Sequence, residues 1–123
     1  MKAIFICNPR CTTCKKAEKF LESKGADFIK RDITKDNPTK EELIAWQKVS
    51  GLDIRKLFNT SGNLYREMGL KDKLDGMSFD EKIELLSTDG LLVKRPILLL
   101  GEKVLVGFNE KVWSEALNDG TSL

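Results

Sequence analysis

The sequence contains no histidine and only three cysteines in its 123 residues. Without histidine, the chain cannot form a Cys-His catalytic dyad, and no side chain of this type can act as a general base. Three cysteines and no histidine also cannot supply the four ligands of a structural zinc site within one chain. A reactive thiol here must therefore be activated by groups other than imidazole.

The sequence also lacks long apolar runs and a strong excess of either charge. No apolar run approaches the roughly 20 residues of a membrane span, and the run at residues 1–7 is too short for the core of a signal peptide. The 21 basic and 19 acidic residues give a net charge of +2, which favours neither direct nucleic-acid binding nor a membrane surface. An odd number of cysteines argues against a structural disulfide framework. We therefore expect a cytoplasmic protein whose thiols are kept reduced.

The first third of the chain predicts a strand, a helix and a second strand. Residues 2–7 are an apolar run of strand length that stops at Asn8-Pro9, and residues 27–33 form a second strand-like segment. Between them, residues 12–24 predict a helix that ends at Gly25. One stripe of this helix carries Cys14, Ala17, Phe20 and Leu21. The two strands are expected to pair in parallel through a right-handed crossover.

Helical patterns fill the middle of the chain, from about residue 38 to residue 90. Capping-box spacing occurs twice, at Thr39 with Glu42 and at Ser78 with Glu81. Residues 54–58 and 64–68 predict two shorter helical pieces between those helices. We expect this stretch to be entirely helical.

The last third predicts an antiparallel hairpin and a final helix. Residues 95–100 and 103–106 are strand-like and are joined by the two residues Gly101-Glu102. Asn109 is placed to cap a helix, and residues 118–123 are expected to be a frayed tail. The residues expected to face inward from that helix are Val112, Trp113, Ala116 and Leu117.

Together these elements predict one α/β domain covering residues 1–123. Its fold class is a thioredoxin-like mixed four-stranded sheet with an α-helical insertion. The core would comprise about residues 1–37 and 91–118, and the insertion about residues 38–90.

Cys11 and Cys14 form a C-x-x-C pair at the start of the first predicted helix. Cys11 lies where free N–H groups and the positive end of the helix favour an anion, and Arg10 adds positive charge nearby. We therefore expect Cys11 to attack first. Cys14 lies on the inward stripe and is expected to resolve a mixed disulfide, leaving an internal disulfide for an external reductant. Inert thiols, or a metal site shared with a second chain, remain alternatives.

Two further positions each allow two interpretations. Cys7 ends an apolar run, so it is either a buried small apolar residue or a third redox partner. Arg95-Pro96 begins the third strand, where proline is tolerated because its missing N–H is not needed. Pro96 could alternatively be a cis-proline that faces the thiols. Arg95 is either an ordinary exposed arginine or a group that binds an oxyanion or stabilises the thiolate.

With these residues identified, the chain resembles the arsenate reductase ArsC/Spx family over almost its whole length. The resemblance is carried by CNPRCTTCKKA at residues 7–17, PTKEEL at 38–43, YREMGL at 65–70, KRPI at 94–97 and GFNE at 107–110. It implies a thioredoxin-like domain with a helical insertion, a nucleophilic Cys11 and a cis-proline at Pro96.

The resemblance also separates two branches of function. Arsenate reductases of the family place three arginines around the catalytic cysteine, and here only Arg95 matches. Asn59 stands at the second position, and the third falls near Gly107 in a segment without arginine. The Spx branch has the same C-x-x-C pair as a redox switch and acts by binding the α subunit of RNA polymerase.

From these features we predict a thiol-disulfide oxidoreductase of the ArsC/Spx family. The catalytic residues would be Cys11, Cys14 and Arg95, with Arg10 and Pro96 supporting the site. No cofactor and no metal are expected, and the partner would be a disulfide protein or an external thiol reductant such as glutathione or thioredoxin. The alternatives are an Spx-like regulator that binds RNA polymerase and an arsenate reductase linked to glutaredoxin or thioredoxin.

Overall fold

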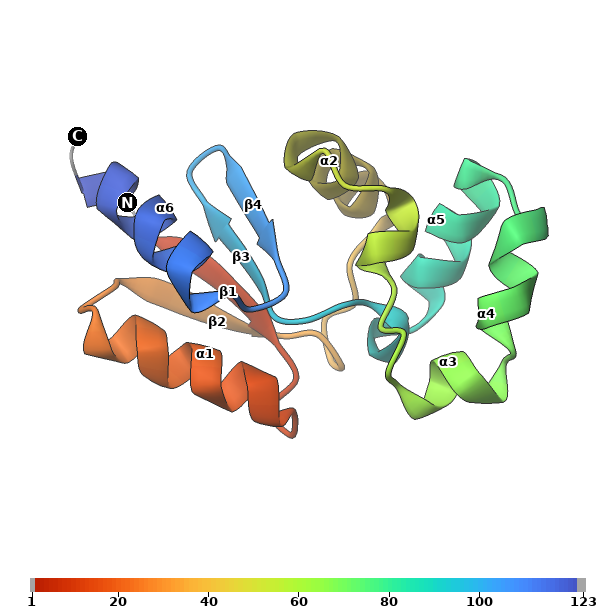
Figure 1. Cartoon of the computed structure of the whole chain (residues 1–123), viewed down its shortest axis with the longest axis horizontal. Helices are drawn as coiled ribbons and strands as arrows, with labels where there is room; N and C mark the ends of the chain where they lie inside the picture. The colour runs from red at the N-terminus through yellow and green to blue at the C-terminus, as the bar shows by residue number, and fades with distance from the viewer. Residues whose placement is uncertain (1, 122–123) are drawn as a thin grey trace. The chain divides into compact units, whose positions relative to one another are not determined.

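The structure is a computed structural model that describes residues 2–121. The chain divides into two compact units. The first unit contains the residues up to Asp32 and those from Arg95 onward, and the second contains Ile33–Lys94. Figure 1 shows the elements of both units. Each unit is described separately below.

The first unit is built on a mixed sheet whose four strands, in the described part of the chain, have the order β2-β1-β3-β4. β1 (Ala3–Cys7) pairs in parallel with β2 (Phe28–Asp32) and antiparallel with β3 (Ile97–Leu100). β3 continues through a tight turn into antiparallel β4 (Lys103–Val106). The predicted parallel pair, the hairpin and the thioredoxin-like fold class are therefore confirmed.

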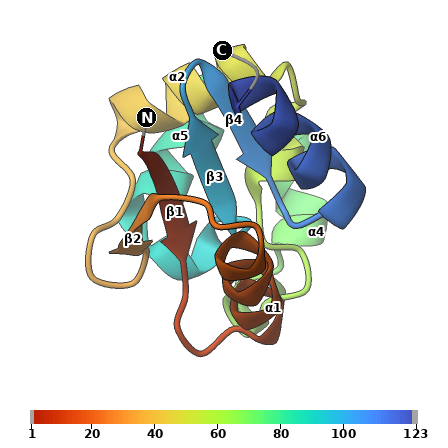
Figure 2. The same cartoon turned by 90° about the vertical axis from the view of Figure 1, so that its left-hand side faces the viewer.

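Two helices of the first unit, α1 (Thr12–Ser23) and α6 (Glu110–Thr121), pack on one face of this sheet (Figure 2). Strand register places Phe5 opposite Leu98, and Phe5 also meets Trp113 of α6 edge to face at 6.3 Å between ring centroids. Such an edge-to-face pair adds about 0.5 to 1.5 kcal/mol beyond the burial of its area. The buried cluster on this face comprises Ala3, Phe5, Cys7, Cys14, Ala17, Phe20, Leu21, Leu98 and Trp113. The thiol side chains of Cys7 and Cys14 thus belong to the core of this unit.

The start of α6 follows the sequence prediction, but two other features of this helix do not. The Asn109 side chain accepts a hydrogen bond from the N–H of Val112 at 3.0 Å, as a capping residue should. Val112 is 45% exposed rather than inward-facing, because the adjacent Trp113 occupies the core position on the first turn. The helix continues to Thr121, so the tail predicted from residue 118 is helical over residues 118–121. Residues 122–123 lie outside the described part.

The second unit is helical. Its α-helices are α2 (Lys40–Ser50), α3 (Asn63–Glu67), α4 (Leu70–Lys73) and α5 (Phe79–Thr88), and its 3-10 helices are η1 (Ile54–Leu57), η2 (Leu74–Gly76) and η3 (Gly90–Leu92). None of the helices in residues 2–121 combines the length and the apolar composition that crossing a membrane requires. The expectation of an entirely helical stretch holds except for an isolated β-bridge between Phe58 and Val93.

Both predicted capping boxes are present in the second unit. At α2, the Thr39 hydroxyl accepts the N–H of Glu42 at 3.1 Å, and the Glu42 carboxylate accepts the N–H of Thr39 at 3.0 Å. Ser78 and Glu81 make the same reciprocal pair at α5, at 3.1 and 2.9 Å. Each box satisfies two N–H groups that have no partner inside the helix. The two longest helices of this unit are therefore fixed at their starts by local sequence.

Gly90 occupies a place in the second unit where no side chain fits. A Cβ atom at this position would lie 2.0 Å from the carbonyl oxygen of Ile33, and the N–H of Gly90 donates to Oδ1 of Asn37 at 3.1 Å. Both contacts involve groups that cannot move aside without displacing backbone or losing a hydrogen bond. The connection into η3 thus depends on glycine.

We predict that Gly90→Ala lowers the free energy of unfolding by about 2 to 3 kcal/mol through this clash. Gly76→Ala is the matched control, because its added Cβ would meet no atom within 4 Å. The control is expected to change the free energy by less than about 0.5 kcal/mol. Urea denaturation of both variants measures the difference, and equal effects would contradict the steric explanation.

Candidate active site

The loop between β1 and α1 is closed by hydrogen bonds to Asn8. The carbonyl of Asn8 accepts the N–H of Cys11 at 2.9 Å, and its side-chain Oδ1 accepts the N–H of Arg10 at 3.0 Å. This turn places Cys11 at the N-cap of α1 with extended backbone angles, and the Cys11 carbonyl accepts the first helical bond from Lys15 at 3.1 Å. The predicted start of the helix is confirmed.

Cys11 is partly exposed, and its pKa is lowered. Burial acts to raise this pKa, but the N–H and the thiol of Cys14, then the N–H of Thr13, stabilise the thiolate and outweigh it. The positive charge of Arg95 acts in the same direction. The N–H groups are those that the first turn of a helix leaves without a helical partner.

Cys14 is buried, whereas Cys11 is partly exposed, although the two cysteines lie one turn apart on the same helix. Cys14 is 2% exposed, and the N–H of Asn8 donates a hydrogen bond to its Sγ at 3.4 Å. Burial, followed by the negative charge of Cys11, raises the pKa of Cys14 to about 12 despite the lowering effect of the Asn8 N–H. The two thiols of the C-x-x-C pair are therefore electrostatically unequal.

Cys7 is buried at the end of β1 with 1% exposure. Burial raises its pKa to about 11, and the nearby charge of Lys30 offsets this only in part. A thiol that is both buried and protonated is a poor nucleophile. These properties favour the interpretation of Cys7 as a small apolar core residue. All three cysteines are free thiols in the structure.

Arg95 and Pro96 lie at the end of the sheet from which the Cys11 loop departs. β3 pairs Ile97 with Ile6 of β1, so the register brings Pro96 opposite Cys7. The Arg95-Pro96 peptide bond is cis, as the resemblance implied. The carbonyl of Pro96 accepts the N–H of Gly107 at 2.8 Å, which ties this segment to the residue after β4. Arg95 thus comes from the segment just before β3, more than eighty residues after Cys11 in sequence.

The structure adds one residue to the predicted set and assigns another a different contact. Arg10 is exposed, so solvent screens its charge, and it participates through its backbone N–H. The sequence marks Asn8 only as the end of a strand. In the structure, however, Asn8 is hydrogen-bonded to the N–H of Cys11 and to the sulfur of Cys14. The Asn-Pro dipeptide is a known turn signal, and an asparagine side chain accepting the N–H two residues later is a common turn device. The Asn8-Pro9 dipeptide could therefore have indicated this turn from the sequence.

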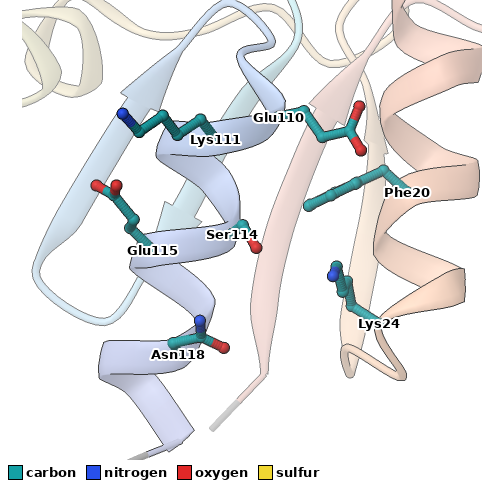
Figure 3. Close-up of a pocket in the computed structure, with 7 residues that line it drawn as sticks. All are labelled: Phe20, Lys24, Glu110, Lys111, Ser114, Glu115 and Asn118. Carbon is teal, nitrogen blue, oxygen red and sulfur yellow. The ribbon is translucent and has the colours of Figure 1, made fainter.

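Other candidate sites do not coincide with the thiols. In residues 2–121, no group of three or more His, Cys, Asp or Glu residues is arranged to hold a metal ion. An open groove of about 440 Å³ lies between α1 and α6 (Figure 3). It is lined by Phe20, Lys24, Glu110, Lys111, Ser114, Glu115 and Asn118. No cysteine lines this groove, so the candidate active site remains the start of α1.

The sequence pattern of the ArsC family matches residues 7–116, a span that contains both the C-x-x-C pair and the segment around Arg95 and Pro96. The chain belongs to the ArsC family. The chain is 50% identical to the uncharacterized protein YusI of Bacillus subtilis, over 94% of this chain and 98% of YusI. Two solved structures also resemble the chain over most of its length.

One such structure is that of an ArsC family related protein from Bacteroides fragilis, with 46% identity, a TM-score of 0.91 and coverage of 94% of this chain and 98% of that one. Another, from Streptococcus mutans, is described as a possible arsenate reductase, with 42% identity, a TM-score of 0.79 and coverage of 87% and 91%. The global transcriptional regulator Spx 2 of Bacillus cereus is 26% identical over 82% of this chain and 76% of its own. The similar proteins thus include one described as a possible arsenate reductase and one described as a transcriptional regulator.

We predict that Arg95→Gln raises the pKa of Cys11, because it removes a positive charge that favours the thiolate. At neutral pH the thiolate fraction, and with it the rate of Cys11 alkylation, should fall by about two- to fivefold. Mass spectrometry of alkylated peptides assigns the reaction to Cys11. Arg10→Gln is the matched control, and an equally large effect in that variant would show that general surface charge, rather than Arg95, controls the thiol.

Proposed function

We propose that this ArsC family protein is a thiol-disulfide oxidoreductase that uses Cys11 and Cys14 as a redox-active dithiol. The observation that carries the proposal is the inequality of the two thiols on one helical turn. The partly exposed Cys11 has a lowered pKa, and the buried Cys14 has a pKa raised to about 12. A reactive outer thiol beside a protected inner one is the arrangement that attack followed by resolution requires.

In the first step, the Cys11 thiolate attacks one sulfur of a substrate disulfide. The substrate S–S bond breaks as the new bond to Cys11 forms, and the departing thiolate takes a proton from solvent. The product is a mixed disulfide between Cys11 and the substrate. The stabilisation of the Cys11 thiolate supplies the nucleophile at neutral pH.

In the second step, Cys14 attacks the sulfur of Cys11. Cys14 loses its proton, the internal disulfide forms, and the second substrate thiol leaves and is protonated. Burial is the largest cause of the high Cys14 pKa. The negative charge of Cys11 and its hydrogen bond with Cys14 are further causes that raise this pKa. Both disappear once Cys11 is in a disulfide, because that sulfur carries no charge. Formation of the mixed disulfide therefore favours ionisation of the resolving thiol.

The full cycle moves two electrons from the dithiol to the substrate and needs an external thiol reductant. A molecule such as glutathione, or a protein such as thioredoxin, would return the internal disulfide to two thiols. Arg95 would contribute by favouring the thiolate of Cys11, both before attack and when Cys11 is released by the reductant. No bound cofactor is required by these steps.

A redox-switched regulator is the second candidate, and the likeness to Spx 2 favours it. In this case the Cys11–Cys14 disulfide would change the binding of a partner, which the Spx resemblance suggests is the α subunit of RNA polymerase. A pull-down of RNA polymerase by the reduced and by the oxidised protein separates the candidates. Binding in one state only would favour the regulator.

Arsenate reduction is a third candidate with less support. The Streptococcus mutans relative favours it, but Arg95 is the one member of the expected arginine trio that the sequence retains. A single guanidinium replaces only part of the hydration of an oxyanion. Arsenate turnover with glutaredoxin or thioredoxin as reductant would support this function over disulfide reduction.

The dithiol proposal predicts different outcomes for the three cysteine variants. With a small disulfide substrate and glutathione, Cys11→Ser should lose at least about 100-fold in turnover, because the nucleophile is gone. With the disulfide substrate alone and no glutathione, Cys14→Ser should instead accumulate a mixed disulfide on Cys11, visible as added mass. Cys7→Ala is the control and should retain turnover. Unchanged turnover in Cys11→Ser would refute the proposal.

A further inference from the structure

We propose that Asn8 is a positioning residue for the resolving step, directing its own backbone N–H at the sulfur of Cys14. The inference rests on the proposed dithiol chemistry and extends it to a residue outside the C-x-x-C pair. The N–H, the carbonyl and the side-chain Oδ1 of Asn8 each make a hydrogen bond, and all three partners lie within residues 10–14.

Asn8 is a buried polar residue, with 8% exposure, and the other buried side chains of its unit, within the described part of the chain, are apolar. A buried amide is unfavourable unless it is hydrogen-bonded, so its presence needs a structural reason. Its Oδ1 accepts the N–H of Arg10 at 3.0 Å, and its carbonyl accepts the N–H of Cys11 at 2.9 Å. These two bonds fold the loop back on itself and fix the orientation of the Asn8 backbone.

The third hydrogen bond involves the resolving thiol itself. The N–H of Asn8 donates to Sγ of Cys14 at 3.4 Å. On one side, Asn8 follows Cys7 of the central strand β1, and on the other it precedes Pro9, which restricts its backbone to extended angles. The direction of this N–H is therefore set by the sheet, by the proline and by the side-chain turn together.

This N–H favours the charged form of a sulfur that burial otherwise keeps protonated. In resolution, Cys14 gives its proton to solvent, its sulfur bonds to Cys11, and the bond between Cys11 and the substrate sulfur breaks. The leaving thiolate is then protonated. In the reverse direction, when a reductant attacks Cys11, the sulfur of Cys14 leaves as an anion and meets the same N–H. Asn8 thus assists both the formation and the opening of the internal disulfide.

A two-phase reaction measures attack and resolution separately. A symmetrical aromatic disulfide with a coloured thiolate product is mixed, in slight excess, with dilute reduced protein. Attack by Cys11 releases the first coloured thiolate, and resolution by Cys14 releases the second. In Cys14→Ser only the first phase should remain. A second phase that persists in this variant would refute the proposed dithiol function itself, whatever the behaviour of Asn8 variants.

In Asn8→Ala the backbone N–H remains but the side-chain turn to Arg10 is lost. The second phase should slow about tenfold, the rate equivalent of weakening one hydrogen bond to a charged group, and the first phase should slow much less, because the Asn8 carbonyl can still accept the N–H of Cys11. The pH at which the second phase reaches half its maximum rate should move upward. Asn8→Ser, whose hydroxyl can close a similar turn, should recover most of the second-phase rate.

A purely structural role gives a different pattern, in which both phases change together and the pH profile of the second phase keeps its position. That pattern would overturn the proposal, as would an unchanged second phase in Asn8→Ala. If Asn8→Ala fails to fold, the comparison of Asn8→Gly with Asn8→Ser carries the same test, because glycine also lacks the side-chain acceptor. Equal second-phase rates in glycine and serine variants would then overturn it.

Discussion

The first turn of α1 is the constraint on which the rest of the site depends. A helix begins with N–H groups that have no partner within the helix, and here the N-cap position is a cysteine. The same groups that would otherwise require water or a capping oxygen therefore stabilise a thiolate at Cys11. Three residues later, the helix turns its buried face to the sheet, and Cys14 lies on that face. A single helical turn thus carries one partly exposed thiol with a lowered pKa and one buried thiol with a raised pKa, without any imidazole.

The sheet determines where the Cys11 loop begins and where Arg95 and Pro96 lie, which the helix alone cannot do. β1 fixes the point from which the loop departs, and its antiparallel pairing with β3 brings Arg95 and the cis-proline Pro96 to the same end of the sheet. Electrostatic coupling then links the two sulfur atoms, because the charge on Cys11 raises the pKa of Cys14. In the proposed cycle, the chemical state of the outer thiol consequently controls the ionisation of the inner one.

Local signals allowed much of this structure to be predicted from sequence. The capping boxes at Thr39 and Ser78, the hairpin at Gly101 and the inward stripe with Cys14 each depend on a few neighbouring residues. One prediction was wrong because a non-local contact decides: Val112 is exposed because Trp113 takes the core position against Phe5. The last helix also extends beyond its expected end, to Thr121. The bond from Asn8 to Cys14 was not foreseen because it depends on how the loop folds back toward the helix.

The most direct test of the account is the reduction potential of the Cys11–Cys14 pair, measured by equilibration with glutathione buffers and counting of free thiols. The account predicts one two-electron transition, lost in Cys14→Ser, at a potential between roughly −200 and −270 mV, where glutaredoxins and thioredoxin lie. A potential near roughly −120 mV, typical of a disulfide-forming oxidant, would contradict a reductase. The absence of any internal disulfide across the titration would contradict the dithiol mechanism altogether.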